Sequence, residues 1–249
     1  MARRWRVFLL LFILALVAAL SFSERLWVRS WSAPLALEIY PVAADAASTA
    51  YVDQVTAEDF RDIADFIRAE APRWRKKPIL PPVITVHAPI RDLPPRMQVR
   101  SGMDAVRASL GLRWYAFRHA PFLASVGRVR LFVLYHRLEF DKALPDSMGM
   151  QKGLIGVAHV YASDRQRPQN AFVIAHELLH TLGATDKYGA GGQPLYPAGI
   201  ADLYADPLYP QQKAEIMAGR IPLSAHSAEI PRSLAQATIG YVTASEIGW

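Results

Sequence analysis

The residues best suited to chemistry in this sequence lie within one short stretch, His176-Glu177-Leu178-Leu179-His180. On an α-helix, residues four apart lie one turn above each other on the same face, so both histidines can turn an imidazole toward one metal ion. Glu177 lies beside them, where its carboxylate can act on water at the metal without being a ligand. The spacing therefore predicts a metal site on a helix with an adjacent general base.

The flanking residues are those of a largely apolar, buried helix. Pro168 or Gln169 can begin this helix, because proline fits the first helical turn. Buried polar side chains need partners, and a metal ion would supply one for both histidines. Two structural histidines in a core are the alternative. The apolar flanking residues are Phe172, Val173, Leu178, Leu179 and Leu182.

A third ligand is expected just beyond the helix. Gly183 falls where a helix ends on a left-handed residue, which turns the chain back toward the metal. Asp186 follows three residues later, and a carboxylate oxygen is an acceptable zinc ligand. The sequence has no cysteine, so histidines and carboxylates must supply the ligands. If Asp186 points away, the alternative third ligands are Glu215, Glu229 and His226.

The extended pattern His-Glu-x-x-His-x-x-Gly-x-x-Asp resembles the metzincin zinc metallopeptidases. It is most similar to the branch with aspartate as third ligand, the snapalysin-like and immune-inhibitor-A-like peptidases. The resemblance runs from about Leu154 to the C-terminus. Met217 is similar to the Met-turn beneath the metal in that clan, and the closing Glu246-Ile247-Gly248-Trp249 is similar to the end of such domains.

The resemblance implies an α+β, metzincin-like domain with a mixed twisted sheet, an active-site helix and a Met-turn. It also implies that residues 154–162 form an antiparallel edge strand that pairs with extended substrate. His159 on this strand could face the cleft, although a core or solvent-facing position is the alternative. A downstream glutamate ligand would instead give the gluzincin arrangement, with the same reaction on a different fold.

The expected mechanism follows from the site. Zinc held by His176, His180 and Asp186 leaves one coordination position for water, the open arrangement of a catalytic site. Glu177 would accept a proton from this water and pass it to the leaving amine. Tyr188 could hydrogen-bond the oxyanion or a zinc ligand, and a packed aromatic ring is the alternative.

The first 31 residues indicate a signal-anchor or transmembrane segment. Arg3, Arg4 and Arg6 precede an apolar run from Val7 to Leu20. Such a run lies between the length of a signal peptide and that of a full bilayer span. The positive-inside rule places the arginines in the cytoplasm and residues 32–249 on the periplasmic side, or the domain is secreted if the segment is cleaved.

Residues 32–249 are expected to form the peptidase domain, with an N-terminal subdomain at 32–150 and the zinc-site subdomain at 151–249. The first subdomain is expected to complete the upper sheet. Hydrophobic periodicity predicts its elements and a C-terminal helix. The expected strands are 35–40, 83–87 and 129–135, and the expected helices are 56–72, 103–112 and 232–241, with a long loop at 188–212.

Charge is unevenly distributed along the chain. Residues 32–71 carry a net charge of −6, whereas residues 72–137 carry +11, more than the +6 of the whole chain. A basic block in a tethered domain could contact anionic lipid headgroups, bind an acidic substrate or form a solvated face. No recognition motif for nucleic acid accompanies it.

Two functions of different kinds remain open. The first is a membrane-tethered zinc endopeptidase that hydrolyses protein or peptide substrates. The second is a non-catalytic zinc domain that binds a peptide or a membrane partner. Glu177 favours the first, since a structural zinc site needs no base beside its ligands.

Overall fold

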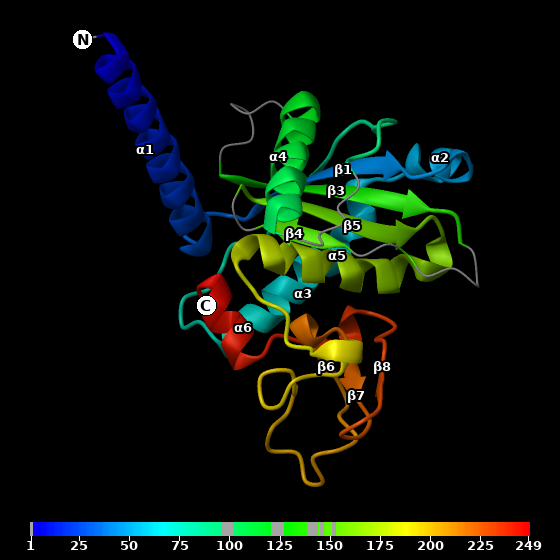
Figure 1. Cartoon of the computed structure of the whole chain (residues 1–249). Helices are drawn as coiled ribbons and strands as arrows, with labels where there is room; N and C mark the ends of the chain where they lie inside the picture. Colours follow the sequence, from blue (N-terminus) through cyan, green and yellow to red (C-terminus); the bar gives the residue numbers. More distant parts are fainter. Residues whose placement is uncertain (1, 96–101, 121–126, 139–143, 145–146, 151–152) are drawn as a thin grey trace.

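A five-stranded mixed sheet forms the centre of the molecule (Figure 1). The computed structural model describes residues 2–95, 102–120, 127–138, 144, 147–150 and 153–249. The strand order is β2-β1-β3-β5-β4, with the first four strands parallel and β4 antiparallel to β5. The strands are β1 Ala36–Ala43, β2 Val83–Val86, β3 Arg128–His136, β4 Met148–Met150 and β5 Ile155–Tyr161. The expectation of an α+β chain with a mixed sheet is thus confirmed.

Alternating side chains divide the sheet into two packed faces. Leu37 and Leu131 belong to the larger core, which is covered by α3 (Arg61–Glu70) and α5 (Arg167–Leu182). Phe132 belongs to the smaller core on the other face, which is covered by α4 (Gly102–His119). Successive strand residues point to opposite faces, so apolar residues at neighbouring positions supply both layers.

Most elements expected before residue 150 are present. The helix after Thr56 begins as the 3-10 turn Ala57–Phe60, continues as α3 and ends in a second 3-10 turn, Ala71–Arg73. The Asp59 carboxylate accepts a hydrogen bond from the Thr56 N–H, so the helical segment begins after Thr56 as predicted. The other two short helical pieces in this part are Ala46–Ser48 and α2 (Thr49–Val52). Helix α4 extends to His119, well beyond the predicted end at residue 112.

Two expectations are wrong. The strand at 154–162 is not an antiparallel edge: β5 is parallel to β3, and β4 covers its other side, so β4 is the edge strand of the described sheet. The helix expected at 232–241 is replaced by the 3-10 turn Leu234–Gln236 and the strand β9 (Ala237–Thr238). β9 pairs with β6 (Ala214–Glu215), and this tertiary pairing overrides the local helical pattern.

The C-terminal part lies beneath α5 (Figure 1). The predicted loop at 188–212 contains only the short 3-10 turn Ala190–Gly192. It leads to β6, to the 3-10 turn Ile216–Ala218, and to the two-residue strands β7 (Ile221–Pro222) and β8 (Ala228–Glu229). The chain ends in α6 (Tyr241–Ile247). The central sheet takes strands from both sides of residue 150, so the two expected subdomains share one sheet.

The N-terminal helix α1 (Ala2–Arg29) projects from the rest of the molecule (Figure 1). Within it, residues Arg4–Arg29 are long and apolar enough to cross a membrane, with a mean hydropathy of 2.5 over the most apolar window and none of that window buried. The helix is therefore compatible with a membrane anchor or a signal sequence.

Candidate metal centre

Helix α5 is fixed closely against β5. The side-chain amide of Asn170 donates to the carbonyl of Tyr161 at 2.8 Å and accepts from its N–H at 3.2 Å, which ties the start of the helix to the end of the strand. Further along, Gly156 lies under the helix, where a Cβ atom would be 2.5 Å from Leu131 and 3.7 Å from the carbonyl oxygen of Glu177. The lack of a side chain at Gly156 thus permits the helix to approach the strand at the turn that carries the motif.

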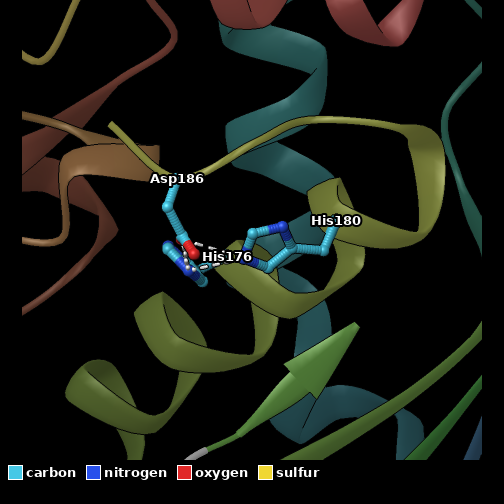
Figure 2. Close-up of side chains that lie close together, drawn as sticks. All are labelled: His176, His180 and Asp186. Atoms are coloured by element: carbon cyan, nitrogen blue, oxygen red, sulfur yellow. Dashed lines mark hydrogen bonds and ion pairs between the residues drawn. The ribbon is translucent and has the colours of Figure 1, made fainter. Parts of the chain in front are cut away.

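Gly183 ends the helix as predicted. Its φ of 111° lies in the left-handed region, and its N–H bonds to carbonyls of the last turn. The N–H of Ala184 bonds to the carbonyl of Leu179 at 3.0 Å. The chain therefore reverses at once and carries Asp186 back over the helix, as Figure 2 shows.

The three predicted ligands meet at one point (Figure 2). The Nε2 atoms of His176 and His180 are 3.0 Å apart. The Oδ1 atom of Asp186 lies 3.3 Å from Nε2 of His176 and 3.1 Å from Nε2 of His180. A tetrahedral ion bound at about 2.0–2.2 Å holds its ligand atoms about 3.3–3.6 Å apart. The observed separations are within a few tenths of an ångström of that spacing.

The backbone fixes the tautomer of both histidines. Nδ1 of His176 lies 2.9 Å from the carbonyl oxygen of Ile216, and Nδ1 of His180 lies 2.9 Å from that of Ala184. Because a carbonyl oxygen can only accept, each Nδ1 carries the hydrogen and each neutral ring presents a bare Nε2 to the cluster. Metal-bound histidines are oriented by second contacts of this kind.

Three hydrogen-bond acceptors therefore face one another at the centre, and they require a cation or a proton between them. The pKa of His176 is raised: burial acts to lower it, but in the protonated ring the Nε2–H donates to Asp186, and this bond and the charge of Glu177 outweigh the burial. Burial alone would raise the pKa of Asp186, but the hydrogen bonds that His176 and His180 donate when a proton is on Nε2, and the positive charge of those rings, hold it well below its usual range. Both shifts show that the cluster favours a positive charge at its centre, and it could bind a metal ion.

Glu177 is the buried carboxylate beside this cluster. Its side chain is only 4% exposed, and its Oε2 atom has no hydrogen-bond partner in the described structure. Burial raises the pKa of Glu177, while the charges of His176 and His180 oppose the shift. An unpaired buried carboxylate oxygen is costly, and such groups concentrate where a protein binds or transfers a proton.

The segment around Met217 forms the support beneath His176. Met217 is fully buried, and its carbonyl accepts from the N–H of Lys187 at 2.9 Å, while its identity as a Met-turn stays a prediction. The preceding carbonyl, that of Ile216, holds the His176 ring. Both contacts depend on the shape of the 3-10 turn Ile216–Ala218.

Glu215 holds that turn in place and is not a ligand. It is fully buried, and its carboxylate accepts from the N–H groups of Met217, Ala218 and Gly240 and from the hydroxyl of Thr243, at 2.6–3.1 Å. The other alternative ligands, Glu229 and His226, are exposed. Within the described residues, the metal cluster contains none of these three.

A second, partly exposed network lies on both sides of Asp186 in the chain. Glu246 on α6 accepts from the N–H of Thr185 at 3.0 Å, from its hydroxyl at 2.7 Å and from the ammonium group of Lys187 at 2.8 Å. The residues immediately before and after Asp186 are thus tied to one carboxylate. This role of Glu246 could not be predicted from the sequence, because no local pattern connects α6 with residues 183–188, the metal loop that carries Asp186.

The remaining predicted residues lie outside the cluster. Tyr188 is 39% exposed and forms a backbone bridge with Pro194, so its role toward the oxyanion stays a prediction. Nδ1 of His159 lies 2.7 Å from Nε2 of His136, on the strands β5 and β3. A cavity of about 950 Å³ lies between the end of α3, residues 200–213 and residues 238–241, and no metal-cluster residue lines it.

Comparison with known proteins gives no family assignment. No family model matches the chain, and no curated protein matches it. Among solved structures, two crystal forms of wild-type OgpA from Akkermansia muciniphila are similar, with TM-scores of 0.45 and 0.41 and 13% sequence identity. The match covers 86% of this chain and 60% of the OgpA chain. A similarity of this size assigns neither a fold family nor an activity.

Proposed function

We propose that this chain is a membrane-anchored zinc endopeptidase of the metzincin type, with aspartate as the third ligand. The observation that carries the proposal is the pairing of a His176–His180–Asp186 cluster with Glu177, a buried carboxylate that has an unpartnered oxygen. A structural zinc site would need no such carboxylate, and burying one without a function is unfavourable.

The chain's own residues would divide the chemistry as follows. The two histidines and Asp186 would hold zinc, and their backbone partners would keep each Nε2 directed at it. Zinc in such a site lowers the pKa of a coordinated water toward neutrality and polarises a carbonyl. Glu177 would take one proton from the attacking water and deliver it to the leaving amine nitrogen as the C–N bond breaks.

The anchor would determine where this activity operates. Helix α1 would cross the membrane with Arg4 and Arg6 on the cytoplasmic side, and the domain would lie on the periplasmic side. Protein or peptide chains on that side of the membrane are the proposed substrates. Cleavage of α1 as a signal sequence would release the same domain.

The Glu177→Gln variant of the full-length chain tests the proposal. Glutamine keeps the size of the side chain but cannot take up the proton, so hydrolysis of an unfolded protein such as casein should fall about 10²–10⁴-fold. Zinc content should remain that of the wild type, because Glu177 is not a ligand. The matched control is Glu229→Gln, at an exposed position on β8, which should change neither quantity.

Two results would contradict the peptidase proposal. Unchanged hydrolysis in Glu177→Gln would remove Glu177 from the mechanism. A zinc-loaded wild type that cleaves none of a broad set of peptides would favour the non-catalytic binding domain.

A further inference from the structure

Helix α4 carries an apolar stripe on the side that faces away from the protein. Its large apolar side chains there are 54–64% exposed although the helix is part of the folded domain. Contiguous exposed apolar surface of this kind marks a site of contact with a protein or a membrane. The stripe consists of Met103, Val106, Leu110, Trp114 and Phe117.

The stripe is distinct from the face that packs on the sheet. Leu112, Tyr115 and Ala116 are buried in the smaller core. At about 100° per residue, these three lie on the opposite side of the helix from the stripe. The spacing of the stripe residues, three or four apart, keeps them in one row. Packing among the residues that the structure describes therefore does not account for them.

Arginines flank the stripe on both sides. By the same helical spacing, Arg107 and Arg118 lie along one border and Arg113 lies along the other. Both Arg107 and Arg118 are well exposed. An apolar row with basic borders and a tryptophan has the composition of a helix face that contacts the headgroup region of an anionic bilayer.

The end of α1 is docked on the same domain, which relates the stripe to the proposed membrane. The Oε1 atom of Glu24 accepts from the N–H of Gly127 at 2.6 Å, and the Trp27 ring packs on that glycine. Val28 and Trp31 are buried in the larger core, and Nε1 of Trp31 donates to the carbonyl of Ile247 at 2.9 Å. Because residues 24–31 are fixed on the domain, a bilayer crossed by α1 would meet the domain at a fixed place.

Figure 1 shows α4 and α1 extending toward the same side of the molecule, while α5 and the C-terminal part lie on the other side of the sheet. We propose that the stripe of α4 is a second membrane contact, inserted among the headgroups of anionic phospholipids around the point where α1 emerges. The bilayer would then hold the domain in one orientation, with the metal centre on the side of the sheet away from the lipid. This inference rests on the proposed anchor but not on the proposed catalysis.

The absence of cysteine allows a direct test in the full-length chain. Single cysteines at Leu110 and Phe117 would carry an environment-sensitive fluorophore, in protein reconstituted into vesicles of phosphatidylcholine and phosphatidylglycerol. The matched control is Tyr204→Cys, at a position that is 96% exposed in the C-terminal part. We expect lipids with a quenching group on the acyl chain to quench the labels at 110 and 117 several-fold more than the label at 204. Iodide dissolved in the water should quench the label at 204 more strongly than the labels at 110 and 117.

Equal iodide quenching at all three positions would overturn the inference. Labels at 110 and 117 that are shielded from both iodide and lipid quenchers would also overturn it, because a protein surface would then cover the stripe. Equal lipid quenching in vesicles of phosphatidylcholine alone would overturn the preference for anionic headgroups. Failure of the wild-type chain to float with the vesicles in high salt would identify a failure of the anchor itself.

Discussion

At the residue scale, the candidate site depends on groups that hold the ligands as much as on the ligands. His176 and His180 are aimed by the carbonyls of Ile216 and Ala184. Asp186 is aimed through its neighbours in the chain, which both bond to Glu246. Loss of a group that orients a metal ligand commonly weakens metal binding by about 10–100-fold.

The acid dependence of stability tests the role of Glu246. Burial alone would raise the pKa of Glu246, but its bonds to Lys187 and Thr185 lower it below the usual value. A lowered pKa stabilises the folded state at pH values above the unfolded pKa of about 4.3, and this contribution is lost as the pH falls through the folded pKa. The difference in melting temperature between wild type and Glu246→Gln should therefore be largest near neutral pH and should shrink below about pH 4.

The control is again Glu229→Gln, which should differ little from wild type at any pH. If the wild type and Glu246→Gln differ by the same amount at every pH, the carboxylate of Glu246 does not stabilise the metal loop through its charge.

The three candidate ligands and the candidate base could be identified from sequence because they lie close together along the chain, two of them at helical spacing. The groups that orient these residues could not be identified from sequence. Ile216 and Ala184 act through backbone carbonyls, which every residue has, and Glu246 is brought to Thr185 only by the fold. The chemistry of Glu215 makes it an alternative ligand in the sequence, but its carboxylate accepts four hydrogen bonds and stabilises the turn at residues 216–218.

At the scale of elements, long periodic segments were predictable and short ones were not. Strands β1, β3 and β5 and helices α3 and α5 follow their hydrophobic patterns. The three-residue β4 has too few positions to show a period, and it takes the edge that was expected for residues 154–162. Residues 237–238 form a strand only because 214–215 lie beside them.

The end of α5 gives a prediction at this scale. Gly183 has a φ of 111°, so Gly183→Ala should destabilise the protein by about 1–2 kcal/mol. The same change should weaken zinc binding, since it displaces the turn that leads to Asp186. Gly102→Ala is the matched control, because the added Cβ meets no heavy atom within 4 Å among the described residues other than its chain neighbours, and the position is the first in α4.

Thermal melting and zinc titration of both variants would check this expectation. We expect Gly102→Ala to be neutral or more stable by up to about 1 kcal/mol. Similar melting temperatures and zinc affinities for the two variants would show that the left-handed turn at Gly183 is not needed for the site.

At the scale of the whole molecule, the C-terminus connects the end of α1 with the loop that carries Asp186. Trp31, just after α1, has its ring centroid 5.3 Å from that of Trp249 and donates to the carbonyl of Ile247. The adjacent Glu246 holds Thr185 and Lys187 on either side of Asp186. The end of α1 and the candidate metal centre are therefore parts of one continuous packed structure.

The zinc content of the purified full-length chain tests the central claim most directly. Wild type and Glu229→Gln should each bind about one zinc ion per chain, whereas His180→Ala and Asp186→Ala should lose it or bind it much more weakly. Mass spectrometry of the metal after dialysis would give all four values. Zinc retained at the wild-type level in Asp186→Ala, or no zinc in the wild type after exposure to it, would contradict the ligand set and with it the proposed peptidase.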